Sequence, residues 1–61
     1  MQDGGRSFEF LVERTDRGWM IVNGSVPFGP FFSKEQALDL ASGMAAAMRA
    51  IGDVVIVRVK D

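Results

Sequence analysis

The chain has 61 residues and a net charge of -1, and it contains neither cysteine nor histidine. These absences exclude disulfides, thiolate and imidazole metal ligands and the commonest general base, and the charge is far from the basic character of most nucleic-acid-binding domains. Because a domain of this length buries only about 60% of its unfolded surface, we expect either an oligomer or an unusually good core.

The N-terminal segment 1–6, MQDGGR, predicts a disordered tail and lacks the apolar stretch of a secretory signal. No apolar run in the chain approaches the ~20 residues of a membrane span. We therefore expect a cytoplasmic protein with no membrane contact and a single small domain over residues 7–61.

Two strands and two tight turns are predicted next. Segment 7–14, SFEFLVER, alternates at period two, which is typical of a half-buried strand. The turn formers of 15–18, TDRG, lead into a returning strand at 19–22, WMIV, and Asn-Gly at 23–24 opens a second hairpin.

Segment 26–32, VPFGPFF, predicts a compromised third strand. Pro27 and Pro30 cannot donate to a ladder, which places this segment at a sheet edge and discourages aggregation there. Whether the segment forms an ordered strand is left open by the sequence.

A helix follows with its start and stop signals. Ser33 is a good N-cap, Gln36 completes a capping box, and Gly52 is the natural C′ residue. Phe32 could form a weak hydrophobic staple with Ala37. The helical wheel predicts one apolar face, flanked by Leu38 and Ala45, that consists of Ala37, Leu40, Ala41, Met44, Met48 and Ile51.

Segment 53–60, DVVIVRVK, predicts the last strand, so the element order is β-β-β-α-β. The helix is long enough to return the chain across the sheet, which makes the last strand parallel to the first. With the proline-bearing strand at an edge, the strand order becomes 3-2-1-4. The predicted fold class is α+β, with one helix packed on one face of a small mixed sheet.

One helix covers one face, and the best candidates for the core are Phe8, Phe10, Val12, Val55, Val57 and Val59. The other face then carries residues 9, 11, 13, 54, 56 and 58, together with either Trp19 and Ile21 or Met20 and Val22. Such a half-apolar face is either partly covered by loops or the tail, or it is a contact site. We therefore predict a homodimer through this face or the last-strand edge, and the predicted interface residues are Leu11, Val54, Ile56 and Arg58, with Trp19 as a further candidate.

No constellation of residues predicts catalysis, a cofactor or a metal. Glu9 and Glu13 are about 13 Å apart along a strand, too far for a carboxylate pair, and Ser33 has a capping role. We predict a protein that is not an enzyme. Nucleic-acid binding through Trp19 and the arginines 14, 17 and 58 is the alternative, although acidic residues interrupt the basic ones.

Three segments together resemble a family of small bacterial proteins, the domain of unknown function 2188. They are Gly18-Trp19, the helix start Phe32-Ser33-Lys34-Glu35-Gln36-Ala37, and Gly52-Asp53 before a valine-rich strand. The resemblance covers residues 7–61, although this chain lacks the histidine often found early in the family's first strand. It implies the architecture above and no established activity.

The segment GPFFSKEQAL is also similar, more weakly, to the helix start of HicB-type antitoxins. Their N-terminal domain has the same β-β-β-α-β order, is non-catalytic, oligomerises and binds a small toxin. The resemblance implies an antitoxin-like regulatory module as a second alternative, but this chain has no appended DNA-binding domain.

Overall fold

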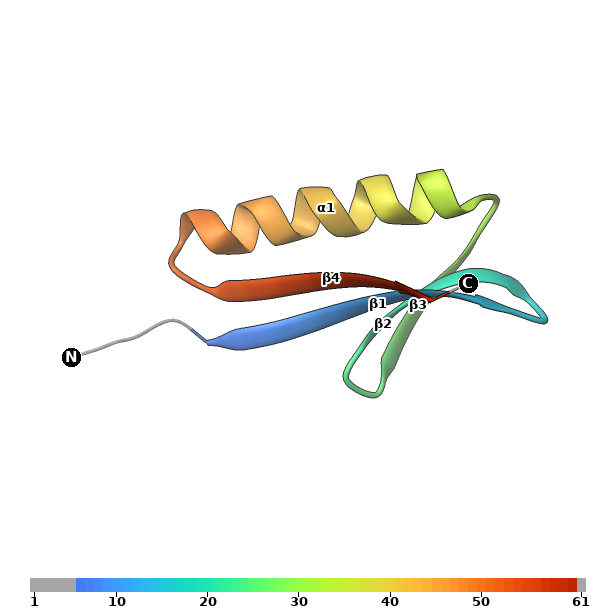
Figure 1. Cartoon of the computed structure of the whole chain (residues 1–61), viewed down its shortest axis with the longest axis horizontal. Coiled ribbons are helices and arrows are strands. Elements are labelled where there is room, and N and C mark those ends of the chain that lie inside the picture. The colour runs from blue at the N-terminus through green and yellow to red at the C-terminus, as the bar shows by residue number, and fades with distance from the viewer. Residues whose placement is uncertain (1–5, 61) are drawn as a thin grey trace.

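The computed structural model describes residues 6–60, and it has the predicted element order (Figure 1). Most of the predicted tail and the final residue lie outside the described part. The elements are β1 (Ser7–Thr15), β2 (Gly18–Asn23), β3 (Val26–Phe31), α1 (Lys34–Ala50) and β4 (Val54–Lys60).

The four strands form one mixed sheet in the order β3-β2-β1-β4. The central strand β1 pairs antiparallel with β2 and parallel with β4, and β2 pairs antiparallel with β3. The helix crosses one face of this sheet (Figure 1). The α+β class and the strand order 3-2-1-4 are thus confirmed.

The proline-bearing segment 26–31 is an ordered edge strand with a bulge. Trp19 pairs with Phe31 and Ile21 pairs with Phe28. Between these two pairs the chain advances two residues on β2 and three residues on β3, so β3 carries one extra residue. The Gly29–Pro30 peptide bond within the bulge is cis. Neither proline stands in a central strand, as their missing N–H groups require.

The ends of α1 are closed by the residues that the sequence indicated. Ser33 Oγ accepts from the Gln36 N–H at 3.1 Å, while Gln36 Oε1 accepts from the Phe32 N–H at 2.9 Å. At the other end, Gly52 has a φ of 98° and its N–H donates to the Arg49 carbonyl. These bonds satisfy backbone groups that helix ends otherwise leave unpaired.

A stripe of alanines lies at the centre of the helix-sheet contact. Ala37, Ala41 and Ala45 are completely buried, because their small side chains let the helix backbone approach the strands closely. The predicted apolar face is correct for Ala37, Ala41, Met44 and Met48, which are buried or pack against the core, but the buried face is rotated towards Ala45. Leu40 and Ile51, expected in the core, lie on one flank of the stripe and are 45% and 79% exposed. Phe32 is 99% exposed, so the predicted staple is absent.

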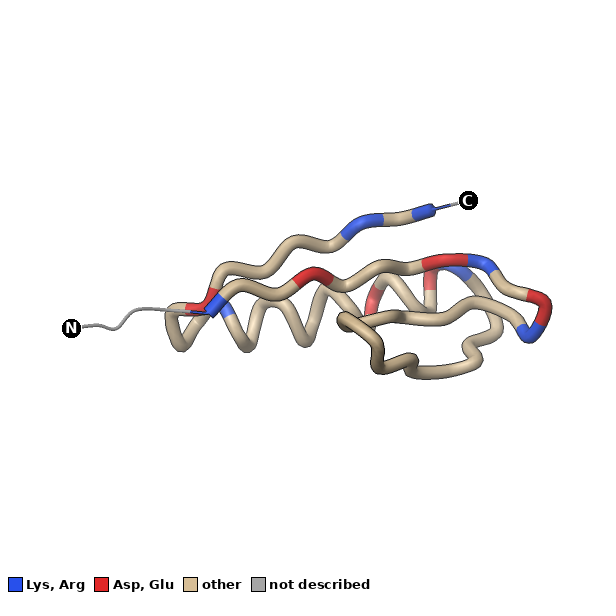
Figure 2. Tube along the Cα trace, turned by 90° about the horizontal axis from the view of Figure 1, so that it is seen from below, with Lys and Arg blue, Asp and Glu red and all other residues tan. Residues whose placement is uncertain are grey.

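The core contributed by the sheet is small. The strand residues that are buried are Phe10, Val12, Ile21 and Val55, and Phe8 and Val57 pack against them. Val59, expected in the core, is 43% exposed. Figure 2 gives the reason, because β4 moves away from α1 towards its C-terminal end.

Arg6, which the sequence placed in the tail, is anchored to the start of β4. Its N–H donates to Asp53 Oδ1 at 3.1 Å, its carbonyl accepts from the Val54 N–H at 2.7 Å, and its guanidinium lies over the Phe8 ring. Within residues 6–60, α1 lacks the length and apolar character that a helix needs to cross a membrane.

Candidate interaction surface

The two edges of the sheet differ in how well they resist pairing with another strand. The β3 edge carries Pro27, Pro30 and the bulge. The β4 edge, VVIVRVK, contains no proline, and its register with β1 runs without a shift. Natural edge strands avoid pairing by means of prolines, bulges or charges. The β3 edge has the first two protections, whereas β4 has only the charges of Arg58 and Lys60 near its end.

The direction of the backbone groups on β4 follows from one hydrogen bond. The Val54 N–H donates to the Arg6 carbonyl, so Val54 and every second residue after it turn their N–H and C=O groups towards β1. The backbone groups of Val55, Val57 and Val59 therefore point outwards from the sheet. Figure 2 shows β4 along one side of the molecule with no described element outside it.

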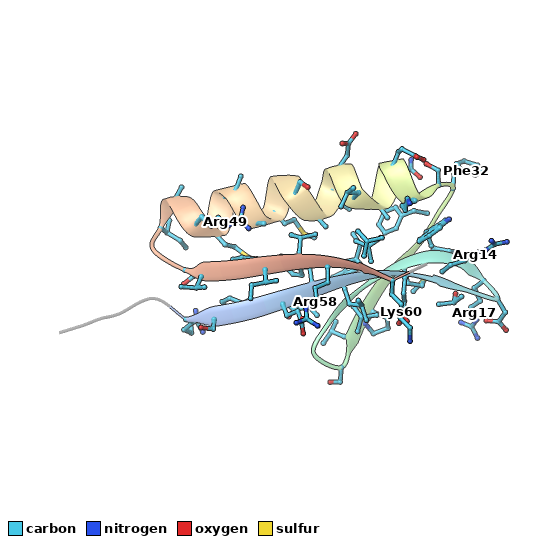
Figure 3. All side chains as sticks on the ribbon, viewed as in Figure 1. Arg14, Arg17, Phe32, Arg49, Arg58 and Lys60 are labelled. Carbon is cyan, nitrogen blue, oxygen red and sulfur yellow. The ribbon has the colours of Figure 1, made fainter. Side chains whose placement is uncertain are left out.

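One of these outward groups has a partner from the helix. Arg49 Nη2 donates to the Val55 carbonyl at 2.6 Å, a bond that is partly buried. Figure 3 shows Arg49 between α1 and β4, on the helix side of the sheet. A carbonyl oxygen has two lone pairs, so the Val55 carbonyl can still accept a second hydrogen bond, from the N–H of a strand added in the plane of the sheet.

The face of the sheet opposite the helix holds four of the predicted interface residues. Leu11 pairs with Val22 on one side and with Arg58 on the other, and Val54 and Ile56 precede Arg58 on the same face. Val54 is 57% and Ile56 is 51% exposed. Of the two pairs left open by the sequence, Met20 and Val22 lie on this helix-free face, because Val22 stands opposite Leu11.

Trp19, the fifth predicted interface residue, does not join this group. It packs against the buried core on the helix side of the sheet, together with Ile21, which is completely buried. Trp19 therefore lies outside the helix-free face, and its role as an interface residue stays a prediction. Trp19 and Met20 are neighbours on β2, so their side chains point to opposite faces.

The charges on the helix-free face are balanced. Arg58 Nε lies 2.7 Å from Glu9 Oε2, and both side chains are more than half exposed. By register Glu13 stands opposite Lys60. Figure 2 shows acidic segments (red) on β1 and basic segments (blue) on the neighbouring β4. This face therefore offers little net positive charge for binding phosphates. Of the three arginines considered for nucleic-acid binding, Arg58 is paired with Glu9, and Arg14 and Arg17 lie outside this face.

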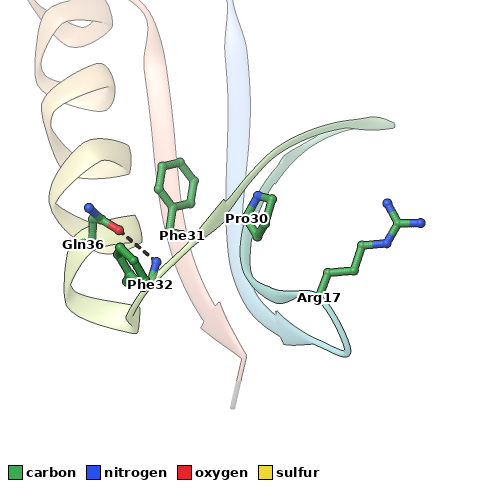
Figure 4. A pocket seen from close by; sticks show the side chains of 5 residues that line it. All are labelled: Arg17, Pro30, Phe31, Phe32 and Gln36. Atoms are coloured by element: carbon green, nitrogen blue, oxygen red, sulfur yellow. Dashed lines mark hydrogen bonds between the residues drawn. The ribbon is translucent and has the colours of Figure 1, made fainter.

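A second surface feature, which the sequence did not predict, lies where β3 meets α1. A hollow of about 410 Å³ is lined by Arg17, Pro30, Phe31, Phe32 and Gln36 (Figure 4). Its polar groups do not converge: the guanidinium of Arg17 points away from the two phenylalanines, and Gln36 is occupied with the Phe32 N–H. Small-molecule sites normally combine apolar walls with convergent polar groups, so this hollow is a weak candidate.

Side chains suited to chemistry are not gathered anywhere in the described part. Within residues 6–60, no group of three or more acidic side chains is arranged to hold a metal ion. The hydroxyl of Ser33 is engaged in helix capping, and Thr15 Oγ1 donates to the Gly18 carbonyl in the first turn. Both hydroxyls have structural roles.

Comparisons of this chain with family models, with curated proteins and with solved structures found no match in any of the three. The resemblances described from the sequence therefore stay predictions.

Proposed function

We propose that this protein is a non-catalytic interaction module that forms a homodimer through the β4 side of its sheet. This side consists of the β4 edge and of the adjoining helix-free residues Leu11, Val54, Ile56 and Arg58. The observation that carries the proposal is the contrast between the two edges: β3 is protected by two prolines and a bulge, while β4 offers an apolar, unshifted strand.

The small core supports the same proposal. Among residues 6–60, only two large side chains, Val12 and Ile21, are completely buried. A chain of this size without disulfides gains stability from a partner subunit more readily than from its own interior. Three of the exposed large apolar side chains, Val54, Ile56 and Val59, lie on β4 at the open edge.

The test is the solution mass across a dilution series, measured by light scattering. We expect a mass about twice that of the 6.7 kDa chain at high concentration, with dissociation on dilution. Ile56→Lys should raise the dissociation constant about tenfold or more, because it removes an apolar contact and adds a charge. Lysine is preferred to glutamate here since residue 56 pairs with Glu9.

The matched control is Val26→Lys on the opposite edge strand. Val26 is 52% exposed and Ile56 is 51% exposed, so the two substitutions change comparable surface. The control should leave the dissociation constant unchanged. A wild-type chain that stays monomeric at every concentration, or an equal effect of both variants, would contradict the proposal. Far-UV circular dichroism checks that both variants fold.

The alternatives from the sequence make different predictions. A nucleic-acid-binding module would use Arg14 and Arg17, and its affinity would fall steeply with salt, whereas an antitoxin-like module would bind a small protein. Titration with a single-stranded oligonucleotide at low salt, followed by amide chemical shifts, would move the resonances of residues 14–17 in the first case. We expect no shift there. The cytoplasmic location and the family assignments stay predictions.

A further inference from the structure

We infer that two copies of the chain pair through antiparallel β4 strands, with the two-fold axis at Val57. The result is one continuous eight-stranded sheet. This inference rests on the proposed homodimer and deepens it, because it names the edge, the direction and the register of the contact.

The direction follows from symmetry. A two-fold axis perpendicular to the sheet makes two copies of one edge strand antiparallel, and it keeps both helices on the same face. A self-contact that uses the same patch on both subunits closes after two chains and leaves no growing end. The remaining edges of the joined sheet would be the two β3 strands, which the prolines and bulges protect.

The outward backbone groups restrict the register. Within β4 (Val54–Lys60), only Val55, Val57 and Val59 present N–H and C=O groups to a second strand, so odd-numbered residues must face odd-numbered residues. The axis then passes through a residue of β4, and not between two residues. Residues 56, 57 and 58 are the axis positions that give substantial overlap of the seven-residue strand.

Overlap and hydrogen bonds favour residue 57. With the axis at Val57, all seven residues of β4 are paired, Val57 faces Val57, and Val55 faces Val59 of the second copy. By symmetry Val59 also faces Val55 of the second copy, which makes three pairs. Each of the three exchanges two backbone hydrogen bonds. With the axis at 56 or 58, only two such pairs form within the strand. The Arg49 bond to the Val55 carbonyl comes from the helix side and leaves a lone pair for this ladder.

Charge on the helix-free face gives an independent argument against an axis at residue 58. An axis at residue 58 would place Arg58 directly opposite its own copy, and like charges directly opposite are destabilising. An axis at Val57 places Arg58 opposite Ile56 of the second copy, and Lys60 opposite Val54. The methylene stems of these cationic residues would then cover Val54 and Ile56, the exposed apolar side chains of β4 on the helix-free face.

The cysteine-free sequence allows a direct test by single-cysteine oxidation. In Val57→Cys, the two Cα atoms would be about 5.5 Å apart, within the range for a disulfide. In Val54→Cys, the two copies would be offset by six positions, about 20 Å along the strands. We expect Val57→Cys to form a disulfide-linked dimer at least tenfold faster than Val54→Cys under diamide, although Val54 is 57% exposed.

A second measurement uses the unchanged chain and does not depend on how the variants fold. Amide hydrogen exchange should be slow for Val57 and Val59 at high protein concentration and should become fast on dilution below the dissociation constant. The N–H groups of Val26 and Phe28, which face β2 in the other edge pair, serve as references, and their exchange should depend much less on concentration than that of Val57 and Val59.

The outcomes separate this inference from the proposed function. A chain that light scattering shows to be monomeric at every concentration overturns both. A dimer in which Val57→Cys links no faster than Val54→Cys, or in which the exchange of Val57 and Val59 does not depend on concentration, keeps the proposed homodimer and overturns the β4 register. Fast linkage with concentration-dependent protection supports both.

Discussion

Replacement of Ala41 by leucine tests the close contact between the helix and the sheet. Ala41 is completely buried at the middle of the alanine stripe, with Ala37 and Ala45 one turn away on either side. Leucine adds three carbon atoms at a point where the helix backbone approaches the strands. Overpacking of this kind costs about 1 to 3 kcal/mol, because the helix must shift or the side chain must leave its preferred rotamer.

That cost is a large fraction of the free energy of unfolding of the chain. At about 0.05 to 0.15 kcal/mol per residue, a chain of this length has a free energy of unfolding of about 3 to 9 kcal/mol. A loss of 2 kcal/mol would lower the midpoint of thermal unfolding by roughly 8 to 16 °C in a domain of this size. Urea unfolding followed by circular dichroism at 222 nm resolves such a change.

The matched control is Ala46→Leu on the exposed side of the same helix. There the substitution meets solvent, and alanine and leucine differ little in helix propensity. We expect a change within about 0.5 kcal/mol. All measurements are made at one protein concentration, since dimerisation would make the midpoint depend on it. If Ala41→Leu were as stable as the wild type, or more stable, the helix would not pack through the alanines, and the reasoning about its rotation would be refuted.

Further predictions concern the helix cap and the bulge. Ser33→Ala removes the acceptor of the Gln36 N–H and should cost about 1 kcal/mol in urea unfolding, while Ser42→Ala on the exposed helix surface should cost nothing measurable; equal effects would argue against the cap. Gly29→Ala should cost about 1 to 3 kcal/mol, because its φ is 128° and a Cβ would lie 3.0 Å from the Trp19 carbonyl oxygen. Gly24→Ala, which also has a positive φ but open space around it, should cost less in the same assay, and the reverse order would show that crowding at the bulge is not the limiting factor.

Most of the fold was predictable from the sequence because its signals are local. Alternation in residues 7–14, the Asn-Gly turn, the Ser33 cap and the Gly52 stop each depend on neighbours within a few positions. Even the strand order followed from a local property, since Pro27 and Pro30 cannot donate hydrogen bonds and therefore belong at an edge. The candidate surface was predicted in part for the same reason: Leu11, Val54, Ile56 and Arg58 share a face by alternation.

Tertiary packing decided what alternation leaves ambiguous. A period of two assigns neighbours to opposite faces without saying which face meets the helix, so only the pairing of β2 with β1 places Trp19 inside and Met20 outside. The rotation of α1 was equally undetermined by the sequence, because a helical wheel places the apolar face where large apolar residues cluster. The close contact between helix and sheet instead buries the alanines and leaves Leu40 and Ile51 at the surface.

The contacts that shape the β4 side also required the folded chain. Arg49 reaches the Val55 carbonyl, Arg58 meets Glu9, and Arg6 is held by Asp53. Two of these three pairs join residues more than forty positions apart, and no local pattern encodes such a distance. The sequence by itself thus determined the elements and the protected β3 edge through short-range chemistry. The tertiary structure decided which backbone groups of β4 face outwards, because that depends on the strand beside which β4 finally lies.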